Sequence, residues 1–207
     1  MLSTLRRQTG TGLRLLIVLT VLCGVAYPLA VWGVSRLPGL SGHAEGSLIT
    51  QGGAVVGSSL IGVDPVPADP AADPYFHTRP SASAEGVLGP ADTTTSGGSN
   101  KAGDSAELLD TVAQRRALIA GREGVAPEAV PTDAVTASAS GLDPDISPAY
   151  AALQVDRVAR VTGLPAERVR DLVVRATDGR ILGFLGEPTV NVTELNLAVA
   201  AAQRSGG

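Results

Sequence analysis

Two histidines are the side chains of this sequence best suited to metal binding or acid–base chemistry near neutral pH. They are His43 and His77, and neither has a second histidine or a cysteine at the spacing typical of metal ligands. One close pair of carboxylates, in Asp143-Pro144-Asp145, has aspartate before proline, a combination that more often begins a turn. We therefore expect no metal site and no tightly bound cofactor.

A serine hydroxyl near a histidine is the minimum needed for nucleophilic catalysis. Ser81 lies four residues after His77. Nothing around Ser81 matches the Gly-x-Ser-x-Gly turn that exposes the nucleophile of many hydrolases, and serines are common throughout this chain. The sequence therefore favours a non-catalytic role.

Glycine and serine dominate the segment Ser96-Gly97-Gly98-Ser99-Asn100, and backbone N–H groups in such loops can surround an anion. The segment lacks the terminal Gly-Lys-Ser/Thr of a phosphate-binding loop, and no predicted strand leads into it. Lys101 follows directly. The local chemistry favours a flexible loop over an anion site.

The elements that position these residues begin with a membrane anchor. Residues 15–34, with Leu15 and Val34 at the ends, carry no charge, and about 20 apolar residues suffice to cross a bilayer. Arg6, Arg7 and Arg14 precede the segment, so the positive-inside rule places residues 1–14 in the cytoplasm and the rest of the chain outside.

A cleaved secretory signal is the alternative to a retained anchor, with a small-residue cleavage site at Gly24-Val25-Ala26. Strong hydrophobicity continues past this point to Trp32, a residue suited to the outer membrane interface. A single-pass anchor in the cell membrane, in contact with lipid, therefore fits better.

Composition limits what the outer part can be. Cys23 is the only cysteine and lies in the anchor, so the outer part has no disulfide. With 3% aromatic residues, 25 glycines and 14 prolines, we expect a modest core and long connections. Beyond the anchor region, 12 basic residues face 20 acidic ones, a net charge of −8 that argues against nucleic acid as a partner.

The patterns predict an α+β domain at residues 47–207, joined to the anchor by a linker at 35–46. Strands are expected at 47–50 and 54–61, as a small hairpin, and at 181–185. Prolines at 64–80 and the Gly/Ser-rich stretch at 86–103 predict irregular structure. About four helices are expected, each from its capping residues: 104–121, 147–163, 165–179 and a last one beginning at Asn191.

Four strings of residues resemble one known family. They are residues 75–82 (YFHTRPSA), 96–100 (SGGSN), 133–148 (DAVTASASGLDPDISP) and 179–197 (GRILGFLGEPTVNVTELNL). Their order and spacing, with the N-terminal anchor, are similar to the C subunit of the Kdp-type potassium-transporting ATPase. The sequence departs from the family pattern at two places. Thr78 stands where the family usually has glycine, and residues 101–104, which carry charges, replace a neutral Leu-Gly-Pro run.

The resemblance implies a noncatalytic subunit of an ATP-driven potassium uptake complex. Its partners would be a channel-like, potassium-binding subunit and a P-type ATPase subunit. The family is described as a catalytic chaperone that raises the affinity for ATP, so contact with ATP is implied by resemblance alone. Because the charge bias places the domain outside, we expect assembly and a cap over the potassium entrance instead. The alternative is an anchored extracellular hydrolase or ligand-binding protein acting alone.

The resemblance also implies interface or motif roles for individual residues. Arg79, Asn100, Asp143 and Asn191 are expected to bond across an interface or brace its loops, whereas Pro80, Pro144, Pro148 and Gly186 shape the backbone. The full set is Tyr75, Phe76, His77, Arg79, Pro80, Ser81, Ser96, Gly97, Gly98, Ser99, Asn100, Gly141, Asp143, Pro144, Ser147, Pro148, Gly186, Glu187, Asn191 and Glu194.

Overall fold

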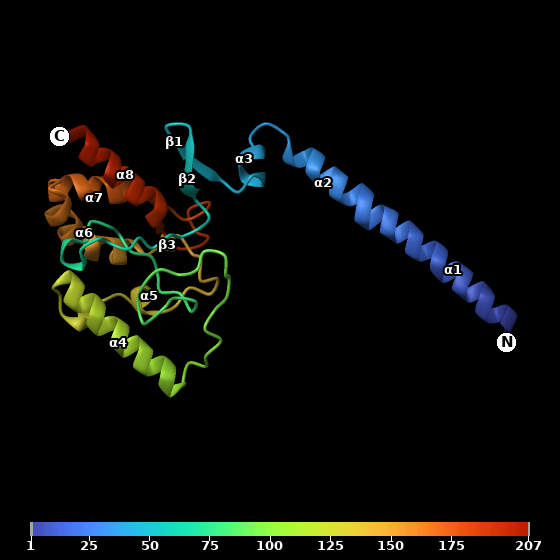
Figure 1. The fold of residues 1–207 in the computed structure, drawn as a ribbon, viewed down its shortest axis with the longest axis horizontal. Coiled ribbons are helices and arrows are strands. Elements are labelled where there is room, and N and C mark those ends of the chain that lie inside the picture. Colours follow the sequence, from blue (N-terminus) through green and yellow to red (C-terminus); the bar gives the residue numbers. More distant parts are fainter. Residues whose placement is uncertain (1, 207) are drawn as a thin grey trace. The chain divides into compact units, whose positions relative to one another are not determined.

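The computed structural model describes residues 2–206 and divides into two compact units, Met1–Leu48 and Ile49–Gly207. The first unit is built on one long helix (Figure 1). This helix comprises α1 (Leu2–Val21), a π-helical turn η1 (Leu22–Ala26) and α2 (Tyr27–Ser35). It is the one helix of the described chain that is long and apolar enough to cross a membrane.

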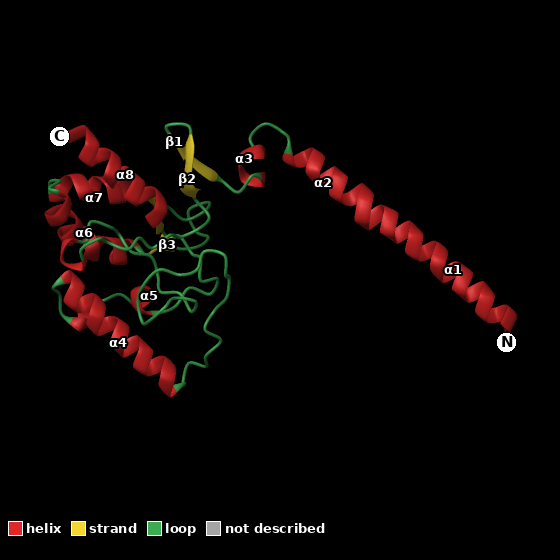
Figure 2. Cartoon of the chain, in the orientation of Figure 1, coloured by secondary structure: helices red, strands yellow, loops and turns green. Residues whose placement is uncertain are grey.

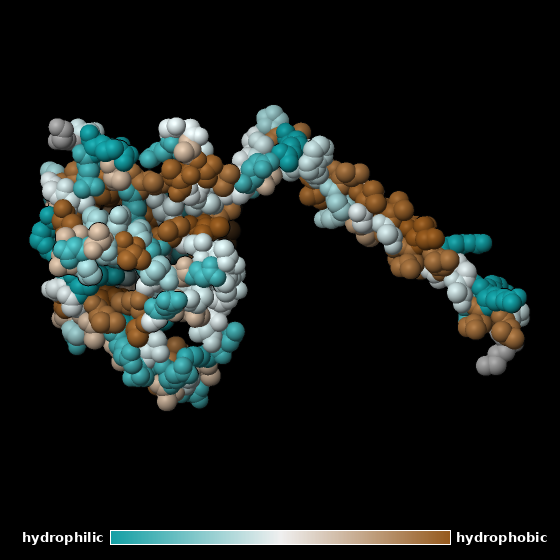
Figure 3. All heavy atoms as spheres, viewed as in Figure 1, coloured by the Kyte–Doolittle hydropathy of each residue, from teal (hydrophilic) through white to brown (hydrophobic). Residues whose placement is uncertain are grey.

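The helix begins well before the predicted span at Leu15, because residues 2–14 contain no proline to stop it. Its apolar side chains are all exposed, and Figure 3 shows them along most of its length, with polar groups near its start. The π turn directly precedes Pro28, which has no N–H and whose ring would clash with the carbonyl of Gly24 in a regular helix. One extra residue in the turn accommodates the proline.

The end of this unit is held by short-range contacts. The Arg36 guanidinium lies 5.5 Å from the centre of the Trp32 ring and pairs with Glu45 at 2.5 Å. A single turn of helix, α3 (Ser41–Ala44), follows.

The hairpin is formed by β1 (Leu48–Gln51) and β2 (Ala54–Ser58), with Gly52 and Gly53 both at positive φ in the turn. This confirms the predicted hairpin, although its second strand ends at Ser58 and not at residue 61. A long irregular stretch follows, containing one 3-10 turn, η2 (Pro70–Ala72).

The helices of the second unit gather on one side and the irregular segments on the other (Figure 2). The order is α4 (Ala106–Glu123), η3 (Pro127–Ala129), α5 (Thr132–Val135), β3 (Asp145–Ile146), α6 (Pro148–Thr162), α7 (Ala166–Arg175), β4 (Thr177–Asp178), β5 (Thr189–Asn191) and α8 (Val192–Gly206). Antiparallel pairing gives the strand order β3-β5-β4. The α+β class is therefore confirmed.

The core lies where α4, α6, α7 and α8 meet the extended segment that carries Phe76. Its largest fully buried apolar side chains are Tyr150, Phe76, Ile119, Ile146 and Leu195. Small and β-branched residues fill most of the remaining core, as the low aromatic content predicted.

Three predicted helix ends are wrong. The first long helix is capped by Ser105, not Asp104, and passes Gly121 to end at left-handed Gly124. The helix predicted to reach residue 179 ends at Arg175, because the chain turns there into β4.

Residues 181–185 form a tight turn and not a strand. Ile181 and Leu185 exchange two backbone hydrogen bonds, while Leu182 and Gly183 adopt positive φ. Strands β3, β4 and β5 were not predicted, since two or three residues are too few to show an alternating pattern.

Two glycines should respond in opposite directions to alanine. A Cβ at Gly62 would lie 2.5 Å from the carbonyl oxygen of Asp143, whereas a Cβ at Gly121 meets no atom within 4 Å. We expect Gly62→Ala to lower the free energy of unfolding by about 1–3 kcal/mol, because backbone must move. Gly121→Ala should raise it by about 0.5–1 kcal/mol, since it removes a glycine from a helix interior. Urea unfolding of the full chain in detergent measures both, and equal effects would contradict the packing at Gly62.

Candidate functional site

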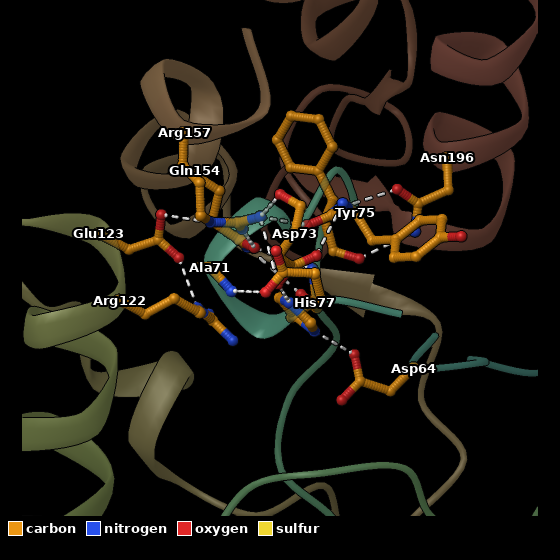
Figure 4. Close-up of polar contacts among 12 residues, drawn as sticks. Asp64, Ala71, Asp73, Tyr75, His77, Arg122, Glu123, Gln154, Arg157 and Asn196 are labelled. Atoms are coloured by element: carbon orange, nitrogen blue, oxygen red, sulfur yellow. Dashed lines mark hydrogen bonds and ion pairs between the residues drawn. The ribbon is translucent and has the colours of Figure 1, made fainter. Parts of the chain in front are cut away.

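Residues 73–81 run through the second unit as extended chain that pairs with no strand. Buried backbone groups need partners, and here side chains supply them. The amide of Asn196 on α8 accepts a hydrogen bond from the Phe76 N–H and donates one to the Phe76 carbonyl, both at 2.8 Å (Figure 4). One side-chain amide thus takes the place of a neighbouring strand.

Helix α6 supplies the next two clamps on the same segment. Gln154 accepts from the His77 N–H at 2.8 Å and donates to the His77 carbonyl at 3.3 Å. Three residues further along the helix, Arg157 donates to the carbonyls of Asp73 and Tyr75 at 2.8 and 2.9 Å. The first three residues of the first family-like motif are therefore held by α6 and α8.

A cluster of buried charges surrounds the His77 imidazole. Its Nδ1 lies 2.7 Å from Asp64, and its Nε2 lies 2.5 Å from Asp73 (Figure 4). The fully buried carboxylate of Glu123 bonds Arg157 at 2.9 Å and Arg122 at 2.6 Å. Arg157 also approaches the Asp73 carboxylate at 3.4 Å.

Charge balance in this cluster depends on the protonation of His77. Three carboxylates face two arginines, so a protonated imidazole makes the cluster neutral. Burial disfavours the charged ring, but the hydrogen bonds to Asp64 and Asp73 outweigh it, and the pKa of His77 lies above its usual 6.5. Burial also opposes charge on Asp73, yet its bonds to His77 and Tyr75 hold the pKa of Asp73 below its usual 3.8.

This arrangement does not support Ser81 and His77 as a nucleophile and base. Both ring nitrogens of His77 are taken by carboxylates, and the Ser81 hydroxyl bonds Ser83 at 3.0 Å. The structure provides no bond between Ser81 and His77 within the described residues. The same residues contain no group of histidine, cysteine and acidic side chains suited to a metal ion.

Arg79 joins the first motif to the third. Its Nη1 lies 3.2 Å from the Asp143 carboxylate, and its Nη2 donates to the Ala137 carbonyl at 3.3 Å. The Arg79 Nε is buried and has no partner in the part of the chain that the structure describes. Asp143 also accepts from the Asp145 N–H, the turn that Asp before Pro predicts.

The glycine-rich motif meets the same region. The Gly97 N–H donates to the Ser140 carbonyl at 2.8 Å, and the Ser138 N–H donates to the Pro80 carbonyl at 2.9 Å. At Gly141, which has φ of 74°, a Cβ would lie 2.8 Å from the Ser81 hydroxyl and 3.0 Å from the Gly97 carbonyl. Glycine is required where these three segments touch.

Other predicted residues build helix starts. Ser147 accepts from the Tyr150 N–H, followed by Pro148 in the first turn of α6, and Asn191 accepts from the Glu194 N–H at the start of α8. These caps confirm the sequence patterns. Asn191 also donates to the Ser59 carbonyl at 2.8 Å.

A third set of predicted residues lies at the surface, away from the buried cluster. Gly186 and Glu187 are exposed, and Glu187 pairs with Arg180. Pro144, by contrast, is buried, and its carbonyl accepts a hydrogen bond from the Val192 N–H. Ser96, Ser99 and Asn100 are exposed as well, as part of the glycine-rich motif.

Several residues of the cluster were not predicted. They are Asp64, Glu123, Gln154, Arg157 and Asn196. A signal existed for one of them: Gln154 lies between Ala151 and Val158 on the apolar stripe of its helix, where a polar side chain must find a buried partner.

Together, the exposed apolar N-terminal helix and the separate α+β unit define a small protein with one candidate membrane span, whose described polar cluster is bonded internally. Comparison with known proteins agrees. A family model described as "KdpC: K+-transporting ATPase, c chain" matches residues 9–201. The chain belongs to this family.

Curated relatives are similar over nearly their whole length. A "Potassium-transporting ATPase KdpC subunit" from Kineococcus radiotolerans is 49% identical over 201 residues, covering 97% of each chain. Proteins of the same name from Streptomyces coelicolor and Variovorax paradoxus are 46% and 50% identical, covering 96% and 92% of this chain and 94% of each relative. The resemblance drawn from the four motifs is confirmed.

The charge on His77 should make stability depend on pH. Because the pKa of His77 is raised on folding, its contribution is complete below about pH 6.5 and is lost as the pH rises through the folded-state pKa. The free energy of unfolding should therefore fall above neutral pH, by at most about 1.4 kcal/mol per pH unit. Urea unfolding at a series of pH values measures this slope.

Two glutamine variants separate the contributions of the two histidines. His77→Gln should flatten the slope, while His43→Gln, a change at the exposed histidine, should leave it as in the wild type. A slope that persists in His77→Gln would show that another group titrates.

Proposed function

We propose that this chain is the noncatalytic subunit that anchors and stabilises a potassium-transporting ATPase complex. Its partners are a potassium-binding, channel-like subunit and a P-type ATPase subunit, as the family resemblance implies. The α1–α2 helix packs among partner helices, and the domain lies outside the cell, where it caps the potassium entrance.

The observation that carries this proposal is the exposed apolar turn at residues 181–185. Leu182 is 80% exposed and Phe184 67% exposed, and Ile181 and Leu185 are exposed beside them. Four large apolar side chains on one five-residue turn form a patch of the kind that marks interaction sites. The turn belongs to the fourth family-like motif, and a partner that covers it would explain why this motif exposes four large apolar side chains.

The buried cluster supports a structural role for the rest of the domain. His77, Asp73 and Arg157 bond one another or the backbone of residues 73–77. Side chains bonded in this way hold the backbone of residues 73–77 in place. The His77 ring is then not free to act as the base that would activate a nucleophile. A hydrolase acting alone is therefore the weaker alternative.

The chaperone role implied by the resemblance requires the subunit to raise the affinity for ATP. Three arginines before the span favour a domain outside the cell, whereas ATP is cytoplasmic. We therefore infer that any effect on ATP affinity is transmitted through the partner subunits. No cofactor of this chain is part of the proposal.

Polar substitutions in the turn test assembly. We expect Leu182→Ser with Phe184→Ser to reduce co-purification with the two partner subunits about tenfold or more, since buried apolar anchors contribute about 2 kcal/mol or more each. The stability of the isolated chain should stay within about 0.5 kcal/mol, because both side chains are exposed.

Leu109→Ser is the matched control, because Leu109 is 58% exposed on α4, outside the motifs. Its complex should purify with full subunit content. Normal subunit content in the double variant would refute the turn as an interface.

Cysteine labelling tests the orientation. In a Cys23→Ser background, Thr93→Cys places a thiol at an exposed loop position of the domain, and Ser3→Cys places one before the span. A membrane-impermeant maleimide should label Thr93→Cys in intact cells and Ser3→Cys only after lysis. The reverse pattern would put the domain beside cytoplasmic ATP and overturn the capping proposal.

A further inference from the structure

Arg115 on α4 is a buried positive charge without a buried counter-charge. The residue is 5% exposed. Its guanidinium donates Nε to the Val87 carbonyl at 3.0 Å and Nη1 to the Val135 carbonyl at 3.2 Å. No carboxylate of the described chain forms an ion pair with it, whereas Arg122 and Arg157 share Glu123. Guanidinium has five N–H donors, so three remain for another acceptor.

The surroundings of Arg115 favour an anion. Carbonyl oxygens satisfy hydrogen bonds but do not neutralise charge, and burial accordingly lowers the pKa of this guanidinium. A buried charge without a paired charge is destabilising. An anion bound beside it would supply the missing charge.

Arg115 lines a cavity of about 350 Å³ that has room for such an anion. The opposite walls come from Ser81, from Gly98 and Ser99 of the glycine-rich motif, and from Lys101, with Thr111 beside Arg115 on α4. This volume lies at the small end of the range for ligand pockets, which favours a small ion over an extended ligand.

The glycine-rich loop lines this cavity through Gly98 and Ser99. Its position is fixed at one end by the Gly97 N–H and the Ser96 hydroxyl, which both bond the Ser140 carbonyl. Beyond Gly97, the N–H groups of residues 98–101 form no hydrogen bond within the described chain. Asn100 has φ of 51°, an uncommon conformation for a residue other than glycine.

Lys101 brings a second positive charge to the cavity. Its ammonium pairs with Glu107, whose side chain is largely exposed to solvent. Exposed pairs of this kind contribute only about 0–1 kcal/mol, so an anion can compete with Glu107 for Lys101. Lys101 is also the only lysine in the chain.

We propose that this cavity is a binding site for a small oxyanion of the phosphate type. The Arg115 guanidinium and the Lys101 ammonium supply charge, and the loop at residues 98–101 supplies N–H donors. The site is separate from the buried cluster at His77 and does not depend on the proposed role in assembly.

Titration of inorganic phosphate into the full-length protein in detergent tests the site. At constant ionic strength and pH 7, calorimetry should show saturable binding at one site. Lys101→Ala should weaken the affinity about tenfold, as expected for the loss of one charge-assisted hydrogen bond. Arg204→Ala, a change at an exposed arginine in the last turn of α8, should leave the affinity unchanged.

The single lysine provides a second readout. Phosphate should protect Lys101 from acylation by an amine-reactive ester, measured by mass spectrometry, and chloride at equal ionic strength should not. Arg115→Gln keeps side-chain donors for the Val87 and Val135 carbonyls but removes the charge, and should abolish binding. If that variant unfolds, the affinity of Lys101→Ala and the protection assay still test whether the cavity binds phosphate.

Three outcomes would overturn the site. They are the absence of saturable phosphate binding, equal affinity in Lys101→Ala and the wild type, and equal weakening by Arg204→Ala. Any of these would show that the cavity is not a phosphate site and holds only water.

Discussion

The domain depends on one constraint: the backbone of residues 73–81 crosses its interior without a neighbouring strand. Buried N–H and C=O groups without partners are costly, and a sheet would normally supply them. Here Asn196, Gln154 and Arg157 do so from two helices. Because these side chains must reach the backbone at fixed points, they set where α6 and α8 lie, and the apolar core fills the space between. The motif is therefore best understood as the part of the chain around which the helices are arranged.

The charges around His77 follow from that arrangement. Arg157 enters the interior to bond two carbonyls, and Glu123 stabilises this buried guanidinium by pairing with it. Asp73 and Asp64 in turn require a protonated His77. The result is a set of charges that is neutral when His77 is protonated and whose members bond one another inside the domain. Exposed apolar side chains lie elsewhere, on the turn at residues 181–185. Internal bracing and exposed apolar surface thus fall on different residues, even within the fourth motif, where Asn196 bonds the Phe76 backbone and the turn at residues 181–185 is exposed.

Local rules predicted the parts of the fold that local interactions determine. The helix starts at Ser147 and Asn191, the stop at Gly163 and the glycine turn of the first hairpin all depend on residues close in sequence. The short strands β3, β4 and β5 could not be predicted in this way, because their pairing joins residues 145–146, 177–178 and 189–191. The same holds for the site. His77 and Arg79 were identified from the motif. Asp64, Glu123 and Asn196 lie outside it, and their roles could not be predicted because they reach the site only when the chain folds.

The π turn before Pro28 has a consequence for how the membrane helix meets its neighbours. One residue more in a turn advances every later side chain by about 100° around the helix axis. The side chains of α2 are therefore rotated from the positions that they would hold if α1 continued without interruption. A straight helix that packed along α1 would therefore meet a different face of α2.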